Sequence, residues 1–201
     1  MINLPLLRTQ TSGPITILSL VLLTMISTSY VVTEFELVFD RDRVISGEVW
    51  RLLTGNLIHT GSIHVLLNVS GIFVLWLLHG DYYRTLSYLG AALFTGVGTT
   101  LGLLLFAPDV FWYMGLSGLL HGIFVWGVAR DFQAGKPTAW ILAAGLVLKL
   151  VWEHFYGGDS SIEQLITAPI ATEAHLYGSI SGALLTGILL MYQGYLPDQL
   201  E

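Results

Sequence analysis

GLSGLLHG, residues 115–122, lies within a segment from 110 to 129 that contains no Asp, Glu, Lys or Arg. A second uncharged segment opens with AHLYG at residues 174–178. Polar and ionisable side chains are costly inside a lipid bilayer, so a serine and a histidine retained there indicate a function. Ser117 and His175 are therefore the first candidates for a functional pair.

The composition indicates an integral membrane protein. Of the 201 residues, 54% are hydrophobic and 11% are charged, and the mean hydropathy is +0.70. Soluble domains carry about 25% charged residues, so the low charge content argues against one. The net charge of −6 provides no basic surface for nucleic acid, and the absence of cysteine excludes disulfides and thiolate metal sites.

Six apolar segments reach or approach the length of about 20 residues that a transmembrane helix needs. We expect an all-α membrane protein, a bundle of six transmembrane helices formed by a single domain over residues 1–201. The first segment is expected to be a retained span and not a signal peptide, because five more follow it. The expected spans cover residues 15–33, 57–79, 85–107, 112–130, 138–156 and 174–194.

The distribution of Lys and Arg favours a cytoplasmic N-terminus. In that orientation the inner side holds four basic residues, Arg8, Arg84, Arg130 and Lys136. The outer side holds three, all in the first loop, Arg41, Arg43 and Arg51. The second, fourth and sixth spans then all start from the outer surface. That arrangement brings five polar residues to similar depth near this surface: His59, His64, Asn68, Ser117 and His175.

The pairing of Ser117 with His175 has a chemical reason. A serine hydroxyl is a weak nucleophile until a neighbouring base takes its proton, and His175 is the candidate base. No acidic residue lies in either motif, and Glu173 would point to another side of its helix. We therefore expect a Ser–His dyad, not a triad, in an intramembrane serine protease.

Glycines explain how the two helices could come together. Small residues four apart let transmembrane helices approach closely. The fourth and sixth expected spans each carry such a pair just after the candidate residue, and the pairs are Gly118 with Gly122 and Gly178 with Gly182.

Peptide hydrolysis also needs hydrogen-bond donors for the oxyanion. His64 and Asn68 are four residues apart, so they share one helix face. The backbone N–H of Ser117 near a helix N-terminus is a further donor. We expect Gly115 and Leu116, which precede it, to belong to the same oxyanion or substrate-binding part of the site.

His121 is the competing base, because it lies four residues after Ser117 on the same helix face. A base on the same helix would leave no cleft for a substrate between itself and the nucleophile. We therefore rank it second, and expect it to stack beside His175 or to steady the tautomer of that ring.

Other polar residues have plainer explanations. Ser117 taken alone could bond its own backbone, His59 could be an interfacial residue, and His79 could cap the inner end of the second span. Lys149 and Glu153 are four apart and could simply form an ion pair. Alternatively, these two charges face the cleft and contact a polar part of the substrate.

The motifs together resemble the rhomboid family of intramembrane serine proteases, and the resemblance covers nearly the whole chain. The matching motifs are Trp50-Arg51, His64-x-x-x-Asn68, Gly-x-Ser117-Gly and Ala-His175-x-x-Gly178-x-x-x-Gly182. The resemblance implies Ser117 as nucleophile, His175 as base, and His64 and Asn68 at the oxyanion hole. It also implies a first loop partly embedded in the outer leaflet.

Two departures from the commonest rhomboids, His121 and the Lys149–Glu153 helix end, resemble the bacterial rhombosortase branch. That resemblance implies cleavage of glycine-rich C-terminal tail anchors of the GlyGly-CTERM type on exported proteins. It also implies a place in the bacterial inner membrane, with the active site open to the periplasm. No cofactor or metal is expected, since His59 and His64 are poorly spaced as ligands and no carboxylate lies nearby in the sequence.

Three alternatives stay open at this point. A generic rhomboid acting on other single-span substrates differs in substrate and not in chemistry. A non-catalytic rhomboid-like protein would bind transmembrane helices, but such relatives usually lose the serine or the histidine. A small transporter is the weakest alternative, because the sequence has no inverted repeat and no acidic relay within its spans.

Overall fold

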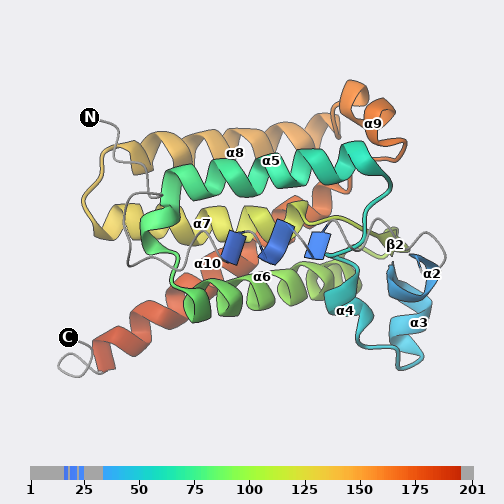
Figure 1. The fold of residues 1–201 in the computed structure, drawn as a ribbon, viewed down its shortest axis with the longest axis horizontal. Coiled ribbons are helices and arrows are strands. Elements are labelled where there is room, and N and C mark those ends of the chain that lie inside the picture. The colour runs from blue at the N-terminus through green and yellow to red at the C-terminus, as the bar shows by residue number, and fades with distance from the viewer. Residues whose placement is uncertain (1–15, 18, 22, 25–33, 196–201) are drawn as a thin grey trace.

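The computed structural model describes residues 16–17, 19–21, 23–24 and 34–195 (Figure 1). The expected first span at 15–33 falls mainly outside this described part of the chain. The elements of residues 34–195 are, in chain order, α2 (Glu34–Leu37), β1 (Phe39–Asp40), α3 (Arg41–Ile45), α4 (Arg51–Thr54), α5 (Ser62–His79), η2 (Gly80–Tyr82), α6 (Thr85–Phe106), β2 (Trp112–Tyr113), α7 (Ser117–Gln133), α8 (Thr138–Tyr156), α9 (Ser160–Ile166) and α10 (Thr172–Tyr195).

The described residues form a helical membrane bundle. Four of their helices are long and apolar enough to cross a membrane, at Ser62–Tyr82, Thr85–Phe106, Thr138–Tyr156 and Thr172–Tyr192. These helices overlap the expected spans 57–79, 85–107, 138–156 and 174–194. The remaining long helix, α7, is shorter, with 17 residues. A bundle of transmembrane helices is thus confirmed, and the count of six stays a prediction.

Two helices start later than expected. The α5 helix begins at Ser62, so His59 lies in the preceding loop and not in the helix. The α7 helix begins at Ser117 because Trp112–Tyr113 forms strand β2, which pairs antiparallel with β1. Gly115 then adopts a φ of +128°, a conformation that interrupts a helix. This pairing joins segments far apart in the sequence, which local hydrophobicity does not reveal.

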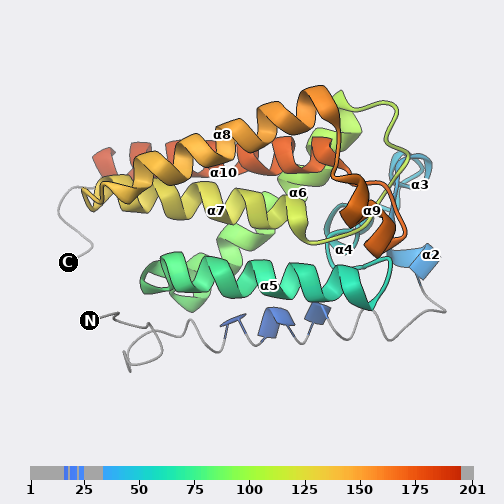
Figure 2. The same ribbon diagram turned by 90° about the horizontal axis from the view of Figure 1, so that it is seen from above.

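Helix α10 packs on α7 at a distance that only glycine permits (Figure 2). A Cβ atom on Gly178 would collide with the carbonyl oxygen of Gly118, and one on Gly182 would collide with that of Gly122. The prediction that these two glycine pairs bring the helices together is confirmed. The consequence for the site is that residues at the start of α7 and of α10 lie side by side.

Helix α5 packs on α7 through apolar side chains. Ile72, Leu75 and Trp76 of α5 share one buried cluster with Leu119 and Ile123 of α7. In Figure 2, α5 and α8 lie on either side of α7 and are well separated. The α5–α7 contact therefore fixes one wall of the space between α5 and α8.

The first loop is folded against the C-terminal end of α6. The guanidinium of Arg41 donates hydrogen bonds to four carbonyl oxygens there, those of Leu103, Leu104, Ala107 and Val110. Leu103 and Leu104 lie in the last turn of α6, and Ala107 and Val110 follow it, so the contact ties the first loop to this end of the helix. Arg51 is buried and pairs with Glu48 at 2.6 Å, whereas its neighbour Trp50 is half exposed. Of the Trp50-Arg51 pair, only the tryptophan faces the surroundings.

A polar cluster closes the opposite end of the bundle. Asp131 Oδ1 accepts hydrogen bonds from the Tyr82 hydroxyl at 2.7 Å and from Lys136 Nζ at 2.8 Å. The other carboxylate oxygen of Asp131 lies 3.2 Å from Nε2 of His79, which is the last residue of α5. The bond with Asp131 raises the pKa of Lys136 above its usual value. His79 therefore joins the ends of α5 and α7 and does more than cap its own helix.

Candidate active site

A cleft of about 1580 Å³ runs between α5 and α8 from the end of the bundle where α5 and α7 begin. Leu67 and Asn68 of α5 line one wall, and Leu146 of α8 lines the other. Ser117 on α7 and His175 on α10 also line the cleft. The two residues singled out from the sequence therefore share one solvent-accessible space.

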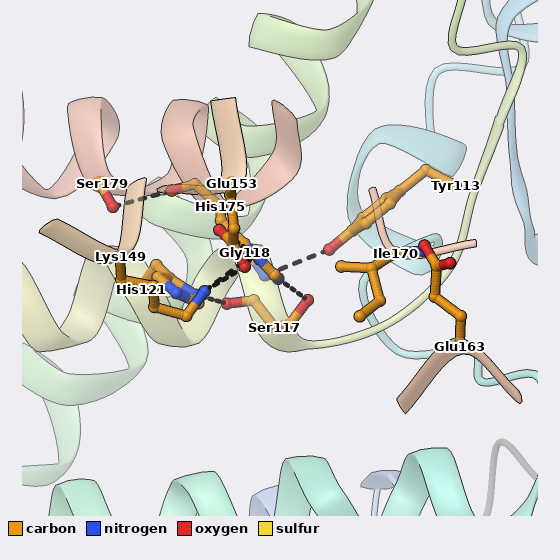
Figure 3. Close-up of polar contacts among 10 residues, drawn as sticks. All are labelled: Tyr113, Ser117, Gly118, His121, Lys149, Glu153, Glu163, Ile170, His175 and Ser179. Atoms are coloured by element: carbon orange, nitrogen blue, oxygen red, sulfur yellow. Dashed lines mark hydrogen bonds and ion pairs between the residues drawn. The ribbon is translucent and has the colours of Figure 1, made fainter. Parts of the chain in front are cut away.

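Ser117 and His175 are in direct contact (Figure 3). Ser117 is the first residue of α7, and His175 lies in the first turn of α10. The Ser117 hydroxyl oxygen is 3.0 Å from Nε2 of His175, although the residues are 58 apart in the sequence. His175 is buried, and its neighbours Ala174 and Gly178 sit in the tight contact with α7. The glycine-mediated packing of α7 and α10 thus sets the position of the pair.

A carboxylate lies on the other side of the His175 ring. The Nδ1 atom of His175 is 2.9 Å from Oε2 and 3.1 Å from Oε1 of Glu153, on α8 (Figure 3). An ionised carboxylate only accepts hydrogen bonds, so this contact favours the tautomer in which Nδ1 is protonated and Nε2 offers its lone pair to Ser117. The expectation that His175 has no acidic partner is therefore wrong. The partner is Glu153, which lies on a third helix, α8, and not in either sequence motif.

Lys149 completes this group of charges. Its ammonium group donates to Glu153 Oε1 at 2.5 Å and lies 3.3 Å from Nδ1 of His175. The ion pair expected from the i, i+4 spacing is present, and it also faces the cleft. Lys149 and Glu153 thus form an ion pair and also face the cleft, and the pair lies beside the ring of His175.

His121 does not contact the Ser117 hydroxyl in this structure. Its Nδ1 donates to the backbone carbonyl of Ser117 at 2.7 Å. Its ring is stacked on that of His175, with centroids 4.2 Å apart and planes at 17°. The geometry therefore places His121 beside His175, as a packing neighbour of the ring.

The oxyanion candidates lie near the loop before Ser117. Nε2 of His64 faces Gly115, since a Cβ atom on that glycine would meet it at 2.7 Å. The other ring nitrogen of His64 is 3.1 Å from the Thr60 hydroxyl. Asn68 is buried, lines the cleft, and its Nδ2 has no hydrogen-bond partner among the described residues. An unused donor of this kind suits a developing negative charge.

Leu116 does not present its side chain to the cleft. That side chain is fully buried in the apolar cluster of α5, α6 and α7. Leu116 could therefore contribute to substrate binding only through its backbone, and its side chain anchors the start of α7 in the core. The sequence alone does not show whether an apolar residue next to a reactive serine binds substrate or packs in the core.

Tyr113 is a residue of the site that the sequence did not single out. Its hydroxyl donates to the carbonyl oxygen of Gly115. It also accepts from the backbone N–H of Gly118 at 3.3 Å, as Figure 3 shows. Burial raises the pKa of Tyr113 to about 12, so the phenol stays neutral. One side chain thereby spans the turn that presents Ser117. The nearest sequence signal was an aromatic residue two positions before Gly115.

His59 lies behind His64 and away from the cleft. It is buried within the protein, and its ring meets that of His64 edge-on with centroids 4.9 Å apart. Its interfacial placement in the membrane stays a prediction. In the described part of the chain, no three His, Cys, Asp or Glu side chains converge as metal ligands. His59 therefore supports the position of His64.

The fold and the site define a class: a helical membrane protein with a serine–histidine pair in a cleft among its spans. Residues 46–192, which are more than half of the chain, match the family model described as Rhomboid domain. The chain belongs to the rhomboid family, whose members are intramembrane serine proteases, and it is a multi-pass membrane protein. No curated protein matches the chain.

Proposed function

We propose that this chain is a serine endopeptidase in which Ser117 is the nucleophile and His175 is the general base. The observation that carries the proposal is the 3.0 Å contact between Ser117 Oγ and His175 Nε2 inside the cleft. A hydroxyl and a base at this distance form the minimal unit of nucleophilic acyl transfer.

The reaction follows from this contact. His175 Nε2 takes the hydroxyl proton as Ser117 Oγ attacks the carbonyl carbon of the scissile peptide bond. The C–N bond of the tetrahedral intermediate then breaks, and His175 gives its proton to the leaving amine. Water next attacks the Ser117 ester while His175 accepts a proton from it. The bond between the acyl carbon and Ser117 Oγ then breaks, and His175 returns the proton to that oxygen, which releases the acid product and restores the serine.

The negative charge on the intermediate needs nearby donors. Asn68 Nδ2 is free to donate among the described residues, and His64 faces the same loop through Nε2. The backbone N–H of Ser117 stands at the start of α7, where the helix dipole favours negative charge. The N–H of Gly118 is used by Tyr113, so it is not part of this set.

The proposed substrates are membrane proteins with a glycine-rich C-terminal tail anchor of the GlyGly-CTERM type. The support for this narrower class is the sequence resemblance to rhombosortases through His121, Lys149 and Glu153. The same resemblance supports a bacterial inner-membrane location and a site open to the periplasm, and the distribution of Lys and Arg supports a cytoplasmic N-terminus. Co-expression with a single-span reporter tests the class: one tail keeps its glycines, and the control tail has leucines in their place.

Labelling with a fluorescent fluorophosphonate tests the chemistry directly. We expect the purified wild type in detergent to be labelled, and both Ser117→Ala and His175→Ala to lose labelling. Removing a catalytic serine or histidine costs about 10⁶-fold in turnover in comparable enzymes, which is below detection here. Circular dichroism of each variant shows whether the fold is kept.

Two other results would change the assignment. Labelling that persists in His175→Ala but is lost in His121→Ala would transfer the role of base to His121. A folded wild type that neither labels nor cleaves any reporter would refute the enzyme proposal and favour a protein that only binds transmembrane helices.

A further inference from the structure

Glu153 is placed to act on the reaction through His175. Both carboxylate oxygens lie within 3.1 Å of Nδ1, on the side of the ring opposite Ser117. The side chains of His175 and Glu153 are 8% and 11% exposed, so this contact is shielded from solvent. A shielded, two-oxygen contact restricts the ring far more than a surface ion pair does.

The contact has two chemical consequences. A carboxylate at Nδ1 selects the tautomer that leaves Nε2 free to accept the Ser117 proton. When that proton arrives, the ring becomes positively charged next to an existing negative charge. In serine hydrolases these two effects are what the acidic member of a triad provides.

Lys149 raises the question of whether Glu153 is merely half of an ion pair. Its ammonium group lies close to both Glu153 and Nδ1 of His175. Because Nδ1 already carries a proton in the active tautomer, Lys149 can donate only to the carboxylate. Lys149 thus neutralises a carboxylate that would be costly to keep charged among apolar helices, and leaves its contact with the ring intact.

We propose that Glu153 is a positioning residue that holds His175 with Nδ1 protonated, so that the site is a Ser117–His175–Glu153 triad assembled from three helices. The inference rests on the proposed function for Ser117 and His175. It assigns to Glu153 a role in turnover and not in recognition of the substrate.

Reporter cleavage by Glu153→Gln provides the kinetic test. We expect kcat to fall about 10³–10⁴-fold with KM changed less than about 2-fold, because the amide no longer selects the tautomer. Glu153→Asp keeps a carboxylate and should retain more activity than Glu153→Gln. Glu36→Gln is the control: it removes an exposed carboxylate that does not line the cleft and should stay near wild type.

Lys149→Met separates positioning from ion pairing. It removes the salt bridge but leaves Glu153 against the ring, so its kcat loss should be at least 10-fold smaller than that of Glu153→Gln. Equal losses in the two variants, with no further loss in the double variant, would overturn the proposal in favour of the ion pair. A raised KM with unchanged kcat in Glu153→Gln would overturn it in favour of substrate recognition.

The tautomer of His175 can also be measured by NMR spectroscopy, and this test does not depend on enzyme activity. The chain has six histidines, and ¹⁵N-histidine spectra in detergent can be assigned to His175 through its loss in His175→Gln. We expect a protonated Nδ1 in the wild type and loss of this preference in Glu153→Gln. A wild-type ring protonated on Nε2 would refute the triad even if cleavage is observed. An inactive wild type with the expected tautomer would refute the proposed function alone.

Discussion

The turn before Ser117 depends on one hydroxyl group. Tyr113 bridges the carbonyl oxygen of Gly115 and the N–H of Gly118, and no water is needed for either contact. Gly115 itself requires a φ of +128°, and its carbonyl direction sets where the following N–H groups point. At the scale of the residue, the precision of the site therefore rests on Tyr113 as well as on the reactive pair.

Tyr113→Phe should damage both stability and turnover. The change leaves two buried backbone groups without a partner, which costs about 1–3 kcal/mol. We expect a lower thermal unfolding midpoint and a kcat at least 10-fold below wild type. Tyr156→Phe, at an exposed position on α8, is the matched control and should match wild type in both measurements. Wild-type kcat in Tyr113→Phe would show that the turn holds its shape without the hydroxyl.

The sequence predicted the helix contact that glycine spacing encodes and missed the contacts that no local motif marks. Ser117 and His175 were paired correctly because glycine spacing predicts which faces of α7 and α10 meet. The acidic partner was missed because Glu153 is 22 residues from His175, and the rotation of α8 about its axis leaves no mark on the sequence. Tyr113 was missed because its role depends on a strand pairing with the first loop.

At the scale of the element, the α7–α10 contact is the most sensitive packing in the bundle. Gly178→Ala places a methyl group against the carbonyl oxygen of Gly118. Neither backbone can yield without moving its whole helix, so we expect a clear fall in the thermal unfolding midpoint and loss of fluorophosphonate labelling.

Gly187→Ala is the control for this prediction. It lies on the same helix, and a Cβ there meets no atom of the described chain within 4 Å. Alanine favours helix over glycine by up to about 1 kcal/mol, so its midpoint should be equal to or above that of wild type. Similar losses in both variants would show that helix propensity, and not close approach, governs the effect.

Helix boundaries were predictable where local residues set them. The α8 helix spans 138–156 as expected, because Pro137 precedes it and Gly157 ends it with a φ of +77°. The start of α7 was misplaced, since nothing local distinguishes Trp112 from an apolar helical residue. The short α9 helix was not foreseen, although Asp159 caps it by accepting from two backbone N–H groups.

At the scale of the whole molecule, the cleft separates a well-packed wall from a loosely packed one. Helix α5 is tied to α7 by a buried apolar cluster. Of the α8 residues, all of which the structure describes, only Ala139 is buried. Relative motion across the cleft should therefore come from α8.

Cross-linking α5 to α8 tests whether substrates pass between them. The chain has no cysteine, so Leu67→Cys with Leu146→Cys gives a clean pair for a bifunctional maleimide. We expect the cross-linked protein to lose cleavage of a membrane-embedded reporter while the small fluorophosphonate still labels Ser117. Each single variant treated in the same way is the control. Unchanged reporter cleavage would place the substrate route elsewhere.

The position of Glu153 on α8 has a consequence for timing. If α8 swings outward to admit a polypeptide, the carboxylate leaves the His175 ring with it, and the imidazole is free to turn. The Ser117–His175 pair would then be inactive while α8 is displaced, and it would become active again only when α8 returns over the bound substrate. The helix that would admit the substrate thus also carries the residue that positions His175, so a brief contact with a passing transmembrane helix would not lead to cleavage.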